Sequence, residues 1–502
     1  MDSNGDTGLN SKKTEVPPPP QYGFFGHPLG LSTLFFTELW ERFSYYGMRA
    51  ILLYYMYDQV SHGGLGINQS TAIALMSAYG ALVYMSSIVG GWVADRLLGS
   101  RRSIFYGGVL IMCGHIVLSI PGGVTALFIS MALIVLGTGM LKPNISTVVG
   151  DLYAKDDLRR DAGFSIYYMG INIGAFIAPY IVGTFGQKVN YHLGFSFAAI
   201  GMALGLAVYM FSGRRTLPAV SLSPKNPLTS EERSRVLFQV GGGILFAVIL
   251  IAVLELTGLL GIKSIVNIIT ILSLVIPIIY FAVMLSSKKT TAVERSRLRA
   301  YIFLFIASIF FWIIDEQGST VLAAYADHRT DLEIFGFSIP SSWFQSLNPI
   351  FTVILSPTFA LIWMKLGRRQ PNTPRKFAYG LVFAGLSFLI LTIPAIVSHS
   401  GKVNPFWLVA SYFLVIVGAM CLSPVGLSAT TKLAPTAFSA QLMSLWMISD
   451  STAQGISAQV VHFYSTNTEA AYFGIVGGVV IVLGIVMYLF APQIHHYMRG
   501  ID

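Results

Sequence analysis

The sequence predicts an all-α membrane protein with fourteen spanning helices, arranged as two six-helix bundles and an inserted helix pair. Three observations predict this class. The 502 residues are 54% hydrophobic and only 11% charged, whereas soluble domains carry about 25% charged residues. Apolar runs of about 20 residues, the length that crosses a bilayer, recur along the chain. The positive charges between these runs fall mainly on alternate loops.

The apolar runs place six spans first, then two, and then six more. The first six are expected near residues 31–57, 71–96, 103–121, 124–150, 163–185 and 191–211. The inserted pair is expected at 237–260 and 265–285. The last six are expected near 299–325, 343–366, 375–398, 404–427, 437–462 and 469–493. Paired bundles of this kind are typical of transporters whose substrate site lies between the halves at mid-membrane.

These spans divide the chain into five segments. They are a disordered N-terminal tail at 1–30, an N-terminal bundle at 31–211, a linker with the inserted pair at 212–298 (the pair at about 237–285), a C-terminal bundle at 299–495 and a C-terminal tail at 496–502. The tail is expected to be disordered because it is polar and then Pro-rich. We expect a structural role for the inserted pair, since Glu255 near its outer end is its single acid.

The loop charges predict the orientation of the chain in the membrane. If both termini are cytoplasmic, the cytoplasmic loops hold most of the Lys and Arg. The opposite loops then hold only Lys188, Lys263, Arg329 and Lys402. This asymmetry follows the positive-inside rule. It also accounts for the net charge of +9, so we expect a lipid bilayer and no nucleic acid as the partner.

The first span carries Glu38, Glu41, Arg42 and Arg49, although each charge at the centre of a span costs roughly 2.5–3.5 kcal/mol on insertion scales. Glu38, Arg42, Tyr46 and Arg49 share one helical face. One interpretation is a ladder of ion pairs that locks the helix. Four charges and two tyrosines exceed what locking needs, so we favour the lining of a polar cavity.

Further ionisable residues lie inside other spans, where such groups usually face a cavity. Lys142 precedes Pro143 in the fourth span; alternatively, its side chain reaches the cytoplasmic surface. Asp315 and Glu316 are about 100° apart on a helix, so both cannot face one partner. A carboxylate beside a movable cation changes its proton affinity as the pair forms and breaks. This is the physical basis of a proton-coupled switch.

Asp450 is a lone acid near the middle of the span predicted at 437–462, the fifth span of the C-terminal bundle. It either takes part in such a switch or is capped by the neighbouring hydroxyls of Ser449 and Ser451. Elsewhere the sequence offers no Ser-His-Asp order, no metal-ligand cluster and no phosphate-binding loop in a usable position. We therefore expect neither an enzyme nor a metal site.

Several motifs together resemble one family. The stretch E-x-x-E-R-F-x-Y-Y-G at 38–47 looks like the hallmark of the proton-dependent oligopeptide transporter family, within the major facilitator superfamily. The supporting stretches are "YYMGINIG" (167–174), "GMLKPN" (139–144), "FQSLNP" (344–349), "SPVGLSATTKLAP" (423–435) and "GGWVADRLLGSRRS" (90–103). The resemblance spans essentially the whole chain, and the inserted pair resembles bacterial members.

The resemblance implies the major facilitator fold and a symporter that imports di- and tripeptides with protons by alternating access. It implies a monomer in the bacterial cytoplasmic membrane, with protons as the coupling ion and no other cofactor. Arg49 would pair with Glu316 to close the outer gate, and Arg49 would also contact the substrate.

The same resemblance implies how the first span works. Glu38, Glu41 and Arg42 would form the proton-coupling motif. Arg42, Lys142 and Tyr46 would meet the peptide carboxylate, because two cations and a phenol suit that group.

The remaining implied contacts surround the rest of the peptide. Asn172 and Asn348 would hold its amino terminus and backbone. Tyr84 and Trp446 would line the side-chain pockets.

The sequence departs from the family at one position. Relatives usually carry a glutamate on the tenth helix where this chain has Ala419. Our hypothesis is that the carboxylate has moved to Asp450, which would then partner Lys142 in proton coupling and contact the peptide; Asp315 is the rival partner. The alternatives are a transporter of a peptide-like drug or another small anion, or a weakly coupled peptide carrier.

Overall fold

The structure is a computed structural model that describes residues 23–154, 157, 159–258, 261–334, 336–398 and 401–501. Among these residues, eleven helices are long and apolar enough to cross a membrane. Three more helices, α1 (Leu29–Tyr57), α8 (Ser230–Leu256) and α15 (Ser439–Val460), bring the spans to the predicted fourteen. Helix α1 carries the charges of Glu38, Glu41, Arg42 and Arg49, and α15 carries Asp450 among several Ser and Gln residues. The predicted all-α membrane architecture is confirmed.

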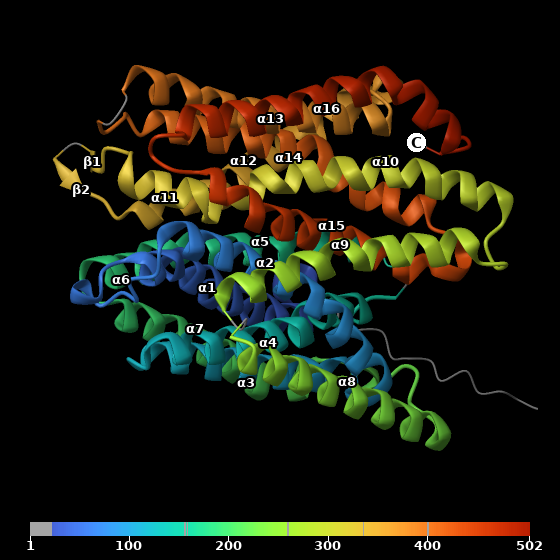
Figure 1. Cartoon of the computed structure of the whole chain (residues 1–502). Coiled ribbons are helices and arrows are strands. Elements are labelled where there is room, and N and C mark those ends of the chain that lie inside the picture. Colours follow the sequence, from blue (N-terminus) through green and yellow to red (C-terminus); the bar gives the residue numbers. More distant parts are fainter. Residues whose placement is uncertain are drawn as a thin grey trace, which may run out of the picture.

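Figure 1 shows two groups of long helices, one above the other. The first half of the chain contributes α2 (Gln69–Val93), α3 (Ser100–Ser119), α4 (Gly123–Asp151), α5 (Arg160–Ala178), α6 (Thr184–Lys188) and α7 (Tyr191–Thr216), besides α1. A π-helical turn, η4 (Pro179–Gly183), joins α5 to α6. The second half contributes α10 (Ala292–Asp315), α11 (Val321–His328), α12 (Leu347–Leu366), α13 (Thr373–Val397), α14 (Phe406–Leu433) and α16 (Glu469–Tyr497), besides α15.

Short elements connect these helices. They include the 3₁₀ turns η1 (Phe24–Gly26), η6 (Glu316–Ser319) and η7 (Ser341–Ser346), and an antiparallel hairpin of β1 (Glu333–Ile334) and β2 (Phe337–Ser338). Helix α10 passes through η6 into α11, so the seventh of the bundle spans is bent where Asp315 and Glu316 lie.

Each half is a bundle of closely packed helices. In the first, α1 packs on α5 and α7, and α4 packs on α2 and α3. In the second, α13 packs on α14 and α16, with α10 against all three. Glycines allow this approach: a Cβ at Gly90 would lie 1.9 Å from the carbonyl oxygen of Gly139. The halves meet where α2 packs on α15 and α5 packs on α12.

The inserted pair is α8 and α9 (Ile262–Ser286). Helix α9 lies against α2 of the first half and α15 of the second. The Thr270 hydroxyl donates to the Gly455 carbonyl at 2.9 Å, and the Thr452 hydroxyl donates to the Ser273 carbonyl at 2.8 Å. Helix α9 is therefore hydrogen-bonded to the second half.

Several helices begin or end away from their predicted bounds. Helix α8 begins at Ser230 rather than at 237, because Thr229 and Glu232 form a capping box that starts the helix before the apolar run. Helix α14 continues to Leu433, six residues beyond the predicted end at 427, and stops before Pro435. Polar helix ends leave no signal in a hydropathy pattern.

The prediction of a disordered tail at 1–30 is wrong for its last residues, from 24 onward. Residues 1–22 lie outside the described residues. Phe24–Gly26 forms η1, and α1 begins at Leu29. The His27 ring is hydrogen-bonded to the Tyr153 hydroxyl at 2.9 Å, and Arg159 donates to the Gly26 carbonyl at 3.2 Å. These contacts with the loop after α4 order the segment before the first span.

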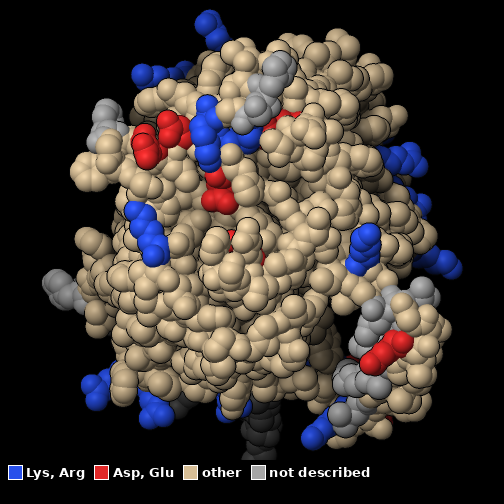
Figure 2. Space-filling view, turned by 60° about the vertical axis from the view of Figure 1, so that its left-hand side comes forward, with Lys and Arg blue, Asp and Glu red and all other residues tan. Residues whose placement is uncertain are grey.

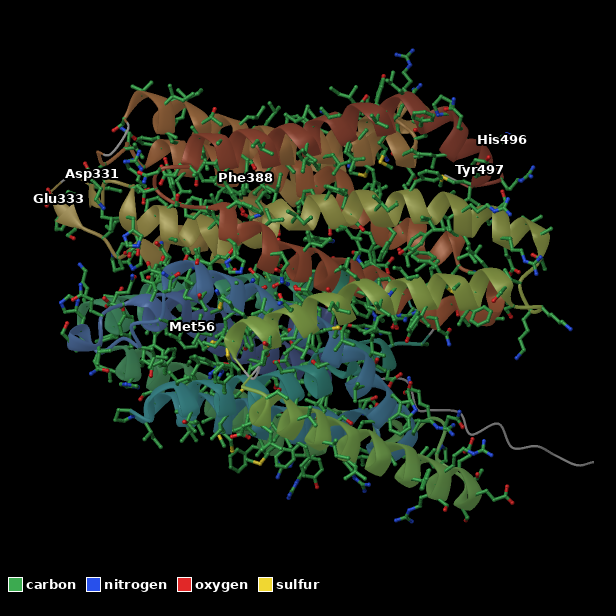
Figure 3. The ribbon with its side chains drawn as sticks, viewed as in Figure 1. Met56, Asp331, Glu333, Phe388, His496 and Tyr497 are labelled. Atoms are coloured by element: carbon green, nitrogen blue, oxygen red, sulfur yellow. The ribbon has the colours of Figure 1, made fainter. Side chains whose placement is uncertain are left out.

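The bundle has two distinct ends. Figure 3 shows Asp331 and Glu333 at one end and His496 and Tyr497 at the other. We call the first the hairpin end, because it carries β1 and β2, and the second the terminal end, because α1 starts and α16 ends there. Figure 2, in which the hairpin end comes forward, shows few charged side chains on an otherwise largely uncharged surface.

Candidate substrate cavity

The charges of α1 form a compact buried group. Glu38, Glu41 and Arg42 are each at most 3% exposed. The Nε atom of Arg42 donates to Glu41 and lies 3.2 Å from Glu38 Oε1. One oxygen of each glutamate and Nη2 of Arg42 have no hydrogen-bond partner among the described residues. The group therefore retains capacity to take up a proton or a polar ligand atom.

Two helical turns further along α1, Arg49 forms an ion pair with Glu316 of η6. Both side chains are largely buried, with 8% and 11% of their surfaces exposed. The pair joins the first half of the molecule to the second, because α1 and η6 belong to different bundles.

More contacts between the halves lie on the hairpin side of this pair. The Trp343 indole donates to the Thr184 hydroxyl at 2.9 Å, and the Tyr57 hydroxyl donates to Asp327 at 2.7 Å. The Gln187 side chain donates to the Ser341 hydroxyl at 2.8 Å. These hydrogen bonds hold the halves together at the hairpin end.

A cavity of about 300 Å³ lies between the two halves, on the inner side of these contacts. Seven of the sequence-predicted site residues line it: Tyr46, Arg49, Tyr84, Asn172, Glu316, Asn348 and Asp450. Ala419 and Asp315 also line it. The five predicted residues that are not among its lining residues are Glu38, Glu41, Arg42, Lys142 and Trp446.

The two predicted carboxylate-binding cations each pack on a tyrosine of the cavity wall. The Arg42 guanidinium lies 6.0 Å from the ring centroid of Tyr46. The Lys142 ammonium lies 4.1 Å from the ring centroid of Tyr84. Lys142 therefore points to the interior of the protein, and its extension to the membrane surface is wrong. Cation–π contacts partly replace the water that these charges lose.

Asp450 is buried on α15, and its Oδ1 accepts a hydrogen bond from Gln454 at 2.7 Å. The alternative in which nearby serines cap it is wrong. The Ser449 hydroxyl donates to the Trp446 carbonyl, and the Ser451 hydroxyl donates to Ala81 of α2. Gln454 was not foreseen, although its position four residues after Asp450 on a helix was the available signal.

Lys142, Trp446 and Asn172 each have different neighbours in the structure. The charges of Lys142 and Asp450 are close enough to interact. Trp446 packs inside the second half, where a Cβ at Gly426 would lie 2.1 Å from its ring. The Asn172 side chain donates to the Tyr168 carbonyl at 2.9 Å, at the cavity wall.

The described residues include no group of three or more His, Cys, Asp or Glu that could hold a metal ion. The chemistry available at the cavity is therefore that of cations, carboxylates, amides and phenols. Such groups bind and release polar solutes and protons.

Two helical bundles with a polar cavity between them define a multi-span membrane transporter, as opposed to an enzyme. A sequence profile described as the POT family matches residues 101–479. The chain belongs to this family, the proton-dependent oligopeptide transporters of the major facilitator superfamily, and the resemblance drawn from its motifs is confirmed.

Individual relatives agree with this assignment. An uncharacterized transporter of Bacillus subtilis, YclF, is 54% identical over 482 residues, which cover 96% of this chain and 97% of the relative. A di-/tripeptide transporter of Lactococcus lactis subsp. cremoris is 48% identical over 486 residues, covering 95% and 98%. The crystal structure of a mutant of the peptide transporter POT, in complex with alafosfalin, matches with a TM-score of 0.92 and 58% identity, covering 96% and 98%.

Proposed function

We propose that the chain is a proton-coupled symporter that imports di- and tripeptides by alternating access. The observation that carries this proposal is the cavity, closed at the hairpin end, with cations on the first half and acids on the second. A zwitterionic peptide fits such a field with its carboxylate toward the first half. The volume of about 300 Å³ is at the lower end of the range for small-molecule sites, about 300–1,000 Å³. The names of the relatives support the substrate class.

Arg42, Lys142 and Tyr46 receive the peptide carboxylate in this proposal. Tyr46 already lines the cavity, while the two cations become accessible when Tyr46 and Tyr84 turn aside. The Nη2 atom of Arg42, which has no partner among the described residues, donates to the carboxylate. Asn172 and Asn348 bond the peptide backbone, Tyr84 contacts a side chain, and Trp446 shapes the second half behind the wall.

Protons act on the acids that face these cations. Glu38 and Glu41 exchange a proton when the carboxylate draws Arg42 away from them. Glu316 exchanges one when its pair with Arg49 opens. Asp450 replaces the carboxylate that relatives carry at the position of Ala419, and it responds to Lys142.

The moving parts are the bundles at 31–211 and 299–495, connected by the linker and inserted pair at 212–298. The hairpin end faces outward and both termini are cytoplasmic, as the loop charges require. The protein works as a monomer in the bacterial cytoplasmic membrane. The pair of Arg49 and Glu316 is the outer gate.

Ala419 favours one second candidate, a carrier of peptides or of a peptide-like drug in which proton coupling is weak. The absence of a carboxylate at 419 removes a proton site without removing the cavity. Dialanine competition against the drug distinguishes the substrates, and accumulation distinguishes the coupling.

The first experiment is uptake of radiolabelled dialanine into proteoliposomes that contain the purified protein, with and without an inward proton gradient. We expect gradient-driven accumulation. Exchange without accumulation would favour the weakly coupled carrier, and no uptake would favour another substrate.

A further inference from the structure

Asp315 is a cavity acid to which the proposed function gives no role. It is the last residue of α10, and its side chain lines the cavity. Its Oδ1 atom is buried and has no hydrogen-bond partner among the described residues. The other two acids of the cavity wall are partnered, Glu316 by Arg49 and Asp450 by Gln454.

A buried carboxylate oxygen without a donor is costly, because desolvation is not compensated by a hydrogen bond. Each such group in a native protein calls for an explanation, such as strain, a functional role or a bound water or ion. Here the oxygen faces a cavity that a solute can enter, so the missing donor can come from the solute.

Three aromatic side chains line the same cavity as this acid. Trp312 lies one helical turn before it and lines the same cavity, as do Tyr168 and Tyr412. Both tyrosines are close enough to Asp315 to feel its charge. A carboxylate that shares a cavity wall with aromatic rings suits an ammonium group, which can donate to the oxygen and be attracted by a ring face. If Asp315 bound only a proton, the rings would give no such attraction, because the protonated carboxyl group is neutral.

The distribution of the other charges around the cavity also favours an ammonium group as the ligand of Asp315. The cations near the cavity, Arg42, Arg49 and Lys142, belong to the first half, whereas Asp315 belongs to the second. Asp450 is already within range of Lys142 and accepts from Gln454. Arg49 is also within electrostatic range of Asp315, but its guanidinium pairs with Glu316. Of the three cavity acids, Asp315 therefore keeps a buried oxygen that can accept from a positive group of the solute.

The geometry points to Asp315 as the residue that binds the α-ammonium group of the transported peptide, inside a cage of Trp312, Tyr168 and Tyr412. This inference rests on the proposed peptide substrate and adds a specificity-determining residue to it. The ammonium group donates to Oδ1, and the peptide lies across the cavity with its carboxylate toward the first half.

The test is a binding measurement on the purified full-length protein, with two ligands that differ in one group. Dialanine is compared with N-propionylalanine, which has a hydrogen in place of the amino group. We expect Asp315→Asn to weaken dialanine binding about 10- to 100-fold, the worth of a charged hydrogen bond. We expect the affinity for N-propionylalanine to stay within about twofold, since that ligand makes no such bond.

Ser423→Ala is the matched control, because it changes another polar side chain of the cavity lining on the second half, one to which the proposed function gives no role. It should leave the preference of the protein for dialanine over N-propionylalanine unchanged. Asp315→Glu should keep that preference, and Asp315→Ser serves as a second neutral variant if Asp315→Asn does not fold.

The inference is overturned if a folded Asp315 variant without the acid keeps the full preference for dialanine. It is also overturned if the variant weakens both ligands equally. If the wild-type protein binds neither ligand, the proposed function itself is overturned. If the wild-type protein binds dialanine but the preference does not depend on Asp315, only this inference is overturned.

Discussion

Arg49 of α1 and Glu316 of η6 form a largely buried ion pair that joins the two bundles at the wall of the central cavity. The pair lies between the cavity and the hydrogen bonds at the hairpin end. Opening of the hairpin end therefore requires that these two charges separate and find other partners. Water, a proton or a substrate carboxylate can provide them.

Neutralising one member of this pair should favour opening of the hairpin end. Glu316→Gln leaves Arg49 buried without its counter-charge, a change that costs about 3–5 kcal/mol for buried pairs. Spin labels at Gln59 and Glu333, in a background without Cys113 and Cys421, would report the separation of the halves. We expect longer and broader distances in Glu316→Gln. Distances identical to those of the unsubstituted background would contradict a gating role, and the exchanged pair Arg49→Glu with Glu316→Arg should restore part of the short distance.

Proton coupling should depend on the guanidinium of Arg42, whose Nε donates to Glu41 and lies 3.2 Å from Glu38. Arg42→Lys keeps the charge but offers a single ammonium point, which does not match two carboxylates in the same way. We expect gradient-driven dialanine accumulation to fall at least about tenfold, equivalent to about 1.4 kcal/mol. Dialanine counterflow without a gradient should fall less. Equal losses in both assays would show that Arg42 serves binding alone.

Asp450 and Gln454 should act as one unit on α15. Gln454→Leu removes the donor at 2.7 Å and leaves a buried carboxylate oxygen unsatisfied, at a cost of about 1–3 kcal/mol. We expect Gln454→Leu and Asp450→Asn both to alter the pH dependence of dialanine uptake. Ser449→Ala is the matched control, because its hydroxyl bonds only the Trp446 carbonyl in the described part of the chain. If Asp450→Asn leaves both affinity and coupling intact, the relocation of the family carboxylate to α15 is wrong.

Two features of the structure could be predicted from periodicity and composition: the order of the spans and the polar face of the first span. The number and order of spans follow from hydropathy, and the stripe of Glu38, Arg42, Tyr46 and Arg49 follows from helical spacing. Gln454, the hydrogen-bond partner of Asp450, was missed. Several polar residues lie within reach of an acid on a helix, and the packing of the side chains decides which of them bonds it.

Contacts between residues far apart in sequence could not be predicted from either property. Arg329 and Glu469 are separated by 140 residues, and the sequence placed Arg329 only in one of the loops opposite the cytoplasmic side. In the structure Arg329 is 2% exposed and Glu469 is 3% exposed. The resemblance to a family indicated the expected gate and cavity residues. The pair of Arg329 and Glu469 belongs to none of the motifs that carried this resemblance, so nothing in the sequence indicated it.

Arg329 should be one of the residues on which the stability of the second half depends most. Its Nε donates to Glu469 at 2.8 Å, and its Nη atoms donate to the carbonyls of Gly401 and Ser398, both at 2.5 Å. It thereby ties the end of α11 to the loop before α14 and to the start of α16. Arg329→Ala should destabilise the folded state by about 3–5 kcal/mol, because it leaves Glu469 charged and buried.

Thermal unfolding of the purified protein, followed by tryptophan fluorescence, would measure this effect as a fall of several degrees in the apparent melting temperature. Lys402→Ala is the control, since its ammonium also donates to a backbone carbonyl, that of Asp327 at the end of α11, but is exposed. Replacing both charges, in Arg329→Met with Glu469→Leu, should recover part of the loss, because no charge is then left buried alone. An unchanged melting temperature in Arg329→Ala would mean that water reaches Glu469 and that the hairpin end is held by the contacts between the halves instead.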